Sequence, residues 1–257
     1  MILRARGFLT ALSLLLSTFI LGDIDDYLPQ DPGPTSSNYG ETGLLEIPTA
    51  RLMPEGSFKF GINSSYPYEM TVIGATPFSW MEATFRYTEI KNLLYSPYPS
   101  FSGNQTFKDK SFDFKFRLLE EKNSIPSVVM GLRDVGGTGF FSSEYLAASK
   151  EFGPVDLTLG LGWGQLARSA TFNNPLTSIH DSFGTRTGYG TGDQGGTFSY
   201  RSWFSGDRIG FFGGLEYKIK KLGTRFKIEY DTSNQRNPLS PLTPIDVGSK
   251  VNYGFSF

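Results

Sequence analysis

The chain ends in Val247-Gly248-Ser249-Lys250-Val251-Asn252-Tyr253-Gly254-Phe255-Ser256-Phe257. From Lys250 onward every second side chain is large and apolar, and the residues between them are polar or glycine. A period of two places successive side chains on opposite faces of a β-strand. The stretch therefore predicts a strand with one aromatic face and one polar face.

The same alternation recurs through most of the chain. Its clearest case runs from Ser111 to Leu119, where Phe112, Phe114 and Phe116 alternate with charged side chains. Ten segments show the pattern, at about residues 56–64, 69–76, 80–89, 111–119, 127–134, 143–150, 155–164, 208–220, 222–231 and 250–257. The sequence therefore predicts an all-β protein of about ten strands.

The connections between these strands alternate in length. Residues 77–79, 120–124, 151–154 and 221 form short breaks. Most of the breaks between them are longer, at residues 90–110, 135–142, 168–207 and 232–246, and residues 65–67 are the exception. Short turns at one end and long loops at the other are typical of outer-membrane β-barrels.

Two features favour a membrane barrel over a soluble β-sandwich, whose strands also alternate. The apolar faces are rich in Phe, Tyr, Trp and Leu, over segments of roughly nine to eleven residues, the length that a tilted strand needs to cross a bilayer. The opposite faces carry charges that fit a polar lumen. We therefore expect a transmembrane antiparallel β-barrel that is complete at Phe257 and closed by the C-terminal strand. A soluble periplasmic β-domain is the alternative.

The final strand also resembles the C-terminal sorting strand of bacterial outer-membrane β-barrels. That strand typically ends on Phe, with aromatic residues two and four positions before it. The resemblance implies recognition by the barrel-assembly machinery through one face of the strand, which carries Val251, Tyr253, Phe255 and Phe257.

The amino end has the pattern of a secretory signal peptide over residues 1–22. Arg4 and Arg6 precede an apolar stretch from Phe8 to Leu21, which is short for a membrane-spanning helix. A retained N-terminal anchor is the alternative. The chain has no cysteine, which argues against disulfides, thiolate sites and a lipid anchor on cysteine. The net charge of −1 gives no case for nucleic-acid binding.

Residues 23–55 form the expected periplasmic linker before a barrel of residues 56–257. Within the linker, Asn38 to Arg51 reads Asn-Tyr-Gly-Glu-Thr-Gly-Leu-Leu-Glu-Ile-Pro-Thr-Ala-Arg. Gly40 and Gly43 suit tight turns, and Leu44 to Ile47 has the composition of a short strand that Pro48 ends.

This stretch resembles the N-terminal signature of the YjbH family, YGxTGLLExPTAR, which precedes a strand of the form Gly-x-aromatic. Gly56-Ser57-Phe58 stands at the expected place. Members are often far longer, so the chain corresponds to their N-terminal barrel region. The resemblance implies a role in exopolysaccharide or capsule export or assembly at the bacterial outer membrane, alongside other polysaccharide-export proteins.

The charges expected in the lumen are the first candidate contacts for an anionic polymer. A basic lumen attracts polyanions, although mutual salt bridges that fill a small barrel are the alternative. The candidate cations are Lys115, Arg117, Lys218, Lys220, Arg225 and Lys227. A small porin, or a structural or adhesive barrel that presents a long surface loop, is the alternative function.

The longest loop, residues 168–207, provides the second set of candidates. With the amino end in the periplasm, this loop is expected to be extracellular, where aromatic rings could stack on sugars or pack over the barrel mouth. The candidate sugar contacts are Tyr189, Tyr200 and Trp203.

Enzymatic chemistry is not expected. His180 is the only histidine and precedes Ser182 by two residues, as in some outer-membrane lipid deacylases, but no carboxylate in a fixed position orients it. A single histidine without cysteine cannot build a histidine-based metal site. The glycines between residues 188 and 196 do not join a strand to a helix, so they are not a phosphate loop. We expect no cofactor.

Overall fold

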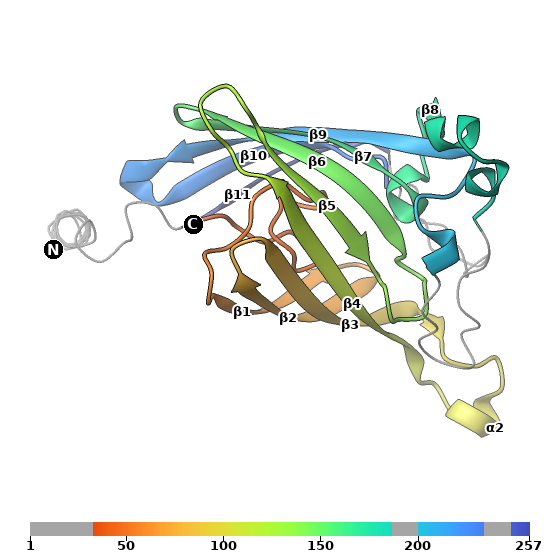
Figure 1. Cartoon of the computed structure of the whole chain (residues 1–257). Coiled ribbons are helices and arrows are strands. Elements are labelled where there is room, and N and C mark those ends of the chain that lie inside the picture. The colour runs from red at the N-terminus through yellow and green to blue at the C-terminus, as the bar shows by residue number, and fades with distance from the viewer. Residues whose placement is uncertain (1–32, 187–199, 234–247) are drawn as a thin grey trace, which may run out of the picture.

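The protein forms one curved antiparallel sheet of eleven strands, as seen in a computed structural model that describes residues 33–186, 200–233 and 248–257 (Figure 1). Ten strands follow one another in the order β1-β2-β3-β4-β5-β6-β7-β9-β10-β11, and β8 pairs with β9. Their bounds are β1 Phe58–Ser65, β2 Tyr68–Phe78, β3 Met81–Leu94, β4 Thr106–Leu119, β5 Ser127–Arg133, β6 Ser143–Phe152, β7 Val155–Gly162, β8 Phe172–Asn173, β9 Arg208–Ile219, β10 Thr224–Tyr230 and β11 Val251–Ser256.

All ten strands predicted from the alternation are present. The additional strand, β8, was missed because two residues are too few to show a period. The helical elements are short: α2 Pro99–Ser102 and the 3-10 helices η1 Gly164–Ala167, η2 Pro175–Ser178, η3 Asp181–Gly184, η4 Tyr200–Ser202 and η5 Lys220–Leu222. In the part of the chain that the structure describes, no helix has the length and hydropathy needed to cross a membrane.

The connections lie at two ends of the sheet, as the sequence predicts. The turns after β2, β4, β6 and β9 are at one end, whereas α2, β8 and the 3-10 helices η1 to η4 are at the other, here called the long-loop end (Figure 1). Successive strands are antiparallel neighbours, so every second connection returns to the same end.

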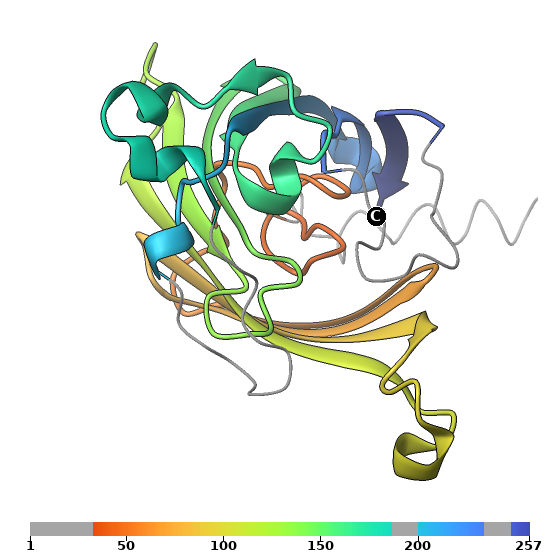
Figure 2. The ribbon, with the colours of Figure 1, turned by 90° about the vertical axis from the view of Figure 1, so that its right-hand side faces the viewer.

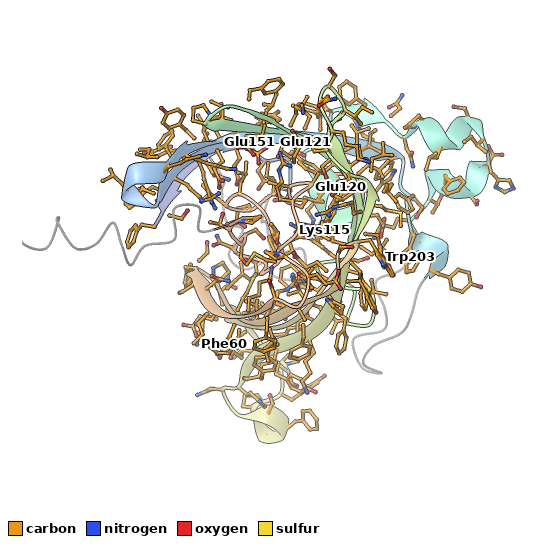
Figure 3. The ribbon with its side chains drawn as sticks, turned by 60° about the vertical axis from the view of Figure 1, so that its left-hand side comes forward. Phe60, Lys115, Glu120, Glu121, Glu151 and Trp203 are labelled. Carbon is orange, nitrogen blue, oxygen red and sulfur yellow. The ribbon has the colours of Figure 1, made fainter. Side chains whose placement is uncertain are left out.

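The two faces of the sheet differ sharply in chemistry. Large apolar side chains on the outer face are exposed, such as Phe60 at 64% and Tyr253 at 77%. Charged side chains on the inner face are buried, including Lys115 at 1% and Glu229 at 2%. Figure 3 shows Phe60 outside the curved sheet and Lys115 inside it. The predicted distribution of aromatic and charged residues over the two faces is therefore confirmed.

The sheet is not closed by hydrogen bonds. β1 pairs with β2, β11 pairs with β10, and these two edge strands are not paired with each other. The expected closure by the C-terminal strand is therefore not seen. Alternation shows which face of β11 is apolar, but it does not specify which strand lies along its second edge.

Residues 34–53, here called the inner segment, lie inside the curved sheet, where the sequence led us to expect a linker. Figure 2 views the molecule from the long-loop end and shows this part of the chain, in orange, enclosed by the strands. The expected short strand from Leu44 to Ile47 is absent, and the segment forms only the isolated bridges Ser36–Thr42 and Gly43–Pro48.

Apolar packing is one physical reason for this position. The inner segment contributes Leu44, Ile47, Ala50 and Leu52 to a buried cluster. The sheet and the residues after β7 contribute the rest of that cluster, namely Val129, Tyr145, Ala147, Leu166 and Phe212. These apolar residues would otherwise face a polar interior, so burying them against the inner segment favours its position.

Candidate functional site

Two carboxylates of the sheet bind the backbone of the inner segment. Glu82 of β3 accepts hydrogen bonds from the amide N–H of Thr42, at 2.7 Å, and from the Thr42 hydroxyl. Glu229 of β10 accepts from three consecutive amides, those of Leu45 at 2.9 Å, Glu46 at 2.9 Å and Ile47 at 3.4 Å. Successive N–H groups that point to one side form a natural anion-binding concavity. Both carboxylates therefore already have hydrogen-bond partners within the protein.

Two lysines bind the carbonyls of the same segment. Lys115 of β4 donates to the carbonyl oxygens of Thr42 and Arg51. Lys227 of β10 donates to the carbonyl oxygen of Leu44 at 2.9 Å and to the hydroxyl of Thr35. A buried ammonium is costly unless its donors are paired, and here the segment provides the acceptors.

Glu41 is the most enclosed acid of the inner segment. Its carboxylate accepts a hydrogen bond from Arg133 Nε at 2.7 Å and from the Tyr145 hydroxyl at 2.6 Å. The guanidinium of Arg133 also lies 4.2 Å from the centre of the Tyr39 ring. Burial alone would raise the pKa of Glu41, but Arg133, Lys115 and the hydrogen bonds together hold that pKa below its usual value. The carboxylate is therefore ionised at neutral pH.

Arg51 fixes the end of the segment to the turns of the sheet. Its Nε and one terminal nitrogen each lie 2.8 Å from an oxygen of Asp156, and the other terminal nitrogen is 2.6 Å from Glu121. Burial would raise the pKa of Glu121, but Lys150, Arg51 and the amide of Glu151 lower it to about 2. The final residue of the signature is thus a bidentate partner of the sheet.

The glycines of the signature are required by close contacts. Gly40 has φ = +89°, and a β-carbon there would lie 2.6 Å from Cβ of Val72. A β-carbon on Gly43 would lie 2.5 Å from the carbonyl oxygen of Ile47. Only glycine fits where the backbone turns and approaches its neighbours this closely. The spacing of the signature is therefore explained by its position inside the sheet.

The predicted lumen cations do not form one open basic surface. Lys115 and Lys227 hold the inner segment. Arg225 pairs with Glu216, and Lys218 Nζ lies 3.2 Å from Glu151. The remaining two candidates are Arg117, which is half-buried on β4, and Lys220, which is exposed in the turn formed by η5.

The predicted loop contacts are partly described. Tyr200 is exposed in η4, and Trp203, which follows it, is half-buried at the long-loop end (Figure 3). Tyr189 lies outside the described residues, as does the expected signal peptide. His180 Nδ1 lies 2.8 Å from the Ser182 hydroxyl and accepts from the Ser182 amide at 3.1 Å. Both side chains are exposed, and the imidazole caps η3, which is a structural arrangement.

Sequence reasoning missed the acids that hold the inner segment. Glu82 alternates with outer-face residues of β3, which placed it on the polar face but gave it no partner. Glu229 was assigned to the lumen without a role, and Glu41 stands at the variable position of the signature and was given no role. The sequence did contain a signal for this contact: a motif with two glycines precedes strands whose polar faces carry acids.

Comparison with known proteins connects this arrangement to a family. The YjbH family model, described as "Exopolysaccharide biosynthesis protein YbjH", matches residues 35–257, from the inner segment to the last strand. The chain belongs to the YjbH family. The "Uncharacterized lipoprotein YjbH" of Escherichia coli (strain K12) is 39% identical over 252 residues, which cover 98% of this chain and 35% of the relative.

The YjbH-family chain therefore spans about a third of the length of the curated relative that it matches. The word lipoprotein belongs to the name of that relative, whereas the 257 residues of this chain include no cysteine. No solved structure matches the chain.

Proposed function

We propose that this YjbH-family chain is an outer-membrane β-barrel that takes part in exopolysaccharide export or assembly. Family membership supports the exopolysaccharide role. The outer face supports the membrane location, because it exposes Phe58 at 70%, Ile62 at 71% and Phe255 at 69% to the surroundings. Large apolar side chains exposed to this extent favour contact with lipid.

Before the sheet can insert into a membrane, the backbone N–H and C=O groups along its two open edges need hydrogen-bond partners. Unpaired backbone N–H and C=O groups are too costly in lipid, and β1 and β11 each have one edge that pairs with no strand among the described residues. The path holds an even number of strands, so β1 and β11 run antiparallel and can pair directly. We propose that they do so in the membrane, which closes a ten-stranded barrel. The exposed aromatic residues of β11 would remain available to the assembly machinery.

The single observation that supports our proposal for how such a barrel works is the inner segment. It occupies much of the interior, where a cavity of about 170 Å³ remains beside Lys218 and Arg225. It also binds buried carboxylates and ammonium groups that line the interior. With the inner segment in place, the lumen is not a polymer channel, and the chain acts on polysaccharide from the long-loop end. A structural or adhesive barrel that presents its loops is the second candidate, and the filled interior favours it over a porin.

Gene deletion with complementation tests the function. Loss of surface exopolysaccharide, restored by the wild-type gene, is expected. The protein should be found in the outer-membrane fraction and should migrate differently on gels before and after heating, as folded barrels do. Unchanged polysaccharide would overturn the role, and absence from the outer-membrane fraction would overturn the location.

Closure can be tested with paired cysteines, since the chain has none of its own. One cysteine replaces Lys59, Gly61 or Asn63 on the inner side of β1, and the other replaces Asn252, Gly254 or Ser256 on β11. A closed barrel gives a disulfide in a few combinations that follow one antiparallel register. If all combinations remain reduced under oxidant in the membrane-inserted protein, direct pairing is wrong.

A further inference from the structure

A cavity of about 560 Å³ lies at the long-loop end, and arginines dominate its charged lining. It is here called the arginine cavity. Its walls come from two stretches, namely η1 with the three residues after it and residues 205–208, which end on the first residue of β9. Arg186 completes the lining. The residues that matter for its chemistry are Arg168, Arg186, Asp207 and Arg208. The volume is in the range of about 300–1,000 Å³ that small-molecule sites occupy.

Arg186 is a fixed part of the cavity wall. Its terminal nitrogens bind both oxygens of Glu144, at 2.8 and 2.9 Å, and also the Ser142 hydroxyl at 2.7 Å. The guanidinium packs over Gly164, where a β-carbon would lie 2.9 Å from Arg186 Cζ. Glu144 therefore balances the charge of Arg186.

Arg208 differs from Arg186 in having no such partner among the described residues. It is exposed at the start of β9, and its guanidinium forms no salt bridge with any residue that the structure describes. Arg168 lines the cavity from the opposite stretch, and Asp207 is the one acid in the lining. Lys250 adds a further cation nearby, since its ammonium lies 3.4 Å from the carbonyl oxygen of Ser169. The cavity therefore has an excess of positive charge.

The backbone of both walls is held in place. The amide of Ser169 donates to Thr232 O at 2.9 Å, and the amide of Asn174 donates to Asp207 O at 2.9 Å. The Asn174 side chain also donates to Gly206 O at 2.9 Å. Walls that are tied in this way lose little conformational entropy on binding. Unlike the interior of the sheet, the arginine cavity is not occupied by any segment of the described chain.

We infer that the arginine cavity binds a carboxylate-bearing sugar unit of an acidic polysaccharide, with Arg208 as the carboxylate ligand and Arg168 on the opposite wall. Guanidinium groups match carboxylates in planar, bidentate geometry, and the Ser169 hydroxyl and the backbone of the lining suit sugar hydroxyls. This inference rests on the proposed function, because it names the class of polymer that the long-loop end would meet.

Binding by the purified, detergent-solubilised full chain tests the inference. The probe is hexagalacturonate, with maltohexaose as the neutral control, in isothermal titration calorimetry at low and high salt. The acidic hexamer should bind, more weakly at high salt, and maltohexaose should not. The variants Arg208→Gln and Arg168→Gln/Arg208→Gln should bind at least about tenfold more weakly.

Lys110→Gln is the matched control, because Lys110 is an exposed cation of β4 outside the cavity. It should bind as the wild type does, and heat-dependent gel mobility confirms that each variant is folded. Absence of hexagalacturonate binding, equal binding of maltohexaose, or unchanged affinity in the folded double variant would each overturn the inference.

The two proposals fail separately. If deletion of the gene abolishes surface polysaccharide but the purified protein does not bind hexagalacturonate, the cavity inference is wrong and the function stands. If the protein binds but deletion leaves the polysaccharide unchanged, the function is wrong and the site stands as a carboxylate site.

Discussion

The interior of the sheet and its long-loop end use charged residues in opposite ways. Inside, Glu82, Glu229, Lys115 and Lys227 are buried, and each is matched to a backbone group of the inner segment. At the long-loop end, Arg208 is exposed beside an open cavity. The difference teaches that a charge on the polar face of a strand is not by itself a ligand site. Whether such a charge can bind a ligand depends on whether it already has a partner inside the protein.

The largest expected effect comes from removing one member of the buried pair of Glu41 and Arg133. Arg133→Met leaves the Glu41 carboxylate buried with Tyr145 as its main partner. Loss of one partner of a buried ion pair costs about 3–5 kcal/mol. The measurement is urea unfolding of the detergent-solubilised protein.

The control for that experiment is Lys91→Met. Lys91 pairs with Glu69 and Glu89 on exposed surface, where a salt bridge contributes little to stability. Equal losses in Arg133→Met and Lys91→Met would mean that the inner segment is not held by buried charge.

A smaller effect is expected from crowding the inner segment. Gly43→Ala places a methyl group against Ile47 O and Ser37 Cβ, and overpacking of this kind costs about 1–3 kcal/mol. Gly248→Ala is the matched control, since a β-carbon there meets nothing within 4 Å. The unfolding midpoints of the two variants should separate clearly. If they coincide with the wild type, the close turn at Gly43 does not exist in solution.

The smallest effect is a dependence on pH that comes from Glu121. Its pKa is about 2 in the folded chain and about 4.3 when unfolded. Because the folded value is the lower one, the stabilisation is complete above about pH 4.3 and is lost as pH falls toward 2. The group is partly exposed, so the contribution is about 1 kcal/mol or less.

Glu121→Gln should therefore lower stability slightly at pH 6 and flatten its decline between about pH 4.3 and 2. Glu120→Gln, a change at the exposed neighbouring residue, provides the comparison. If stability depended on pH in the same way in both variants, Arg51 and Lys150 would not be the cause of the pH dependence.

Much of the fold could be predicted from the sequence, and much of the site could not. Alternation such as that of Phe112 and Asp113 defined the strands and their faces, because it is a local property. The amides that bind Glu229 are 182 to 184 residues away from it along the chain. No local sequence pattern predicts such a contact. The inner segment was read as a linker for the same reason, since proline and glycine indicate irregular backbone without showing whether it is buried.

A disulfide between the inner segment and the inner face of β11 tests its position most directly. A β-carbon on Gly254 would lie 3.8 Å from Cγ of Leu45, the place that a cysteine sulfur would take. In the membrane-inserted protein, Leu45→Cys/Gly254→Cys should form a disulfide under mild oxidant. Leu45→Cys/Tyr253→Cys should not, because Tyr253 is on the outer face. Failure of the first pair, or equal cross-linking of both, would contradict a barrel whose interior is filled by its own signature.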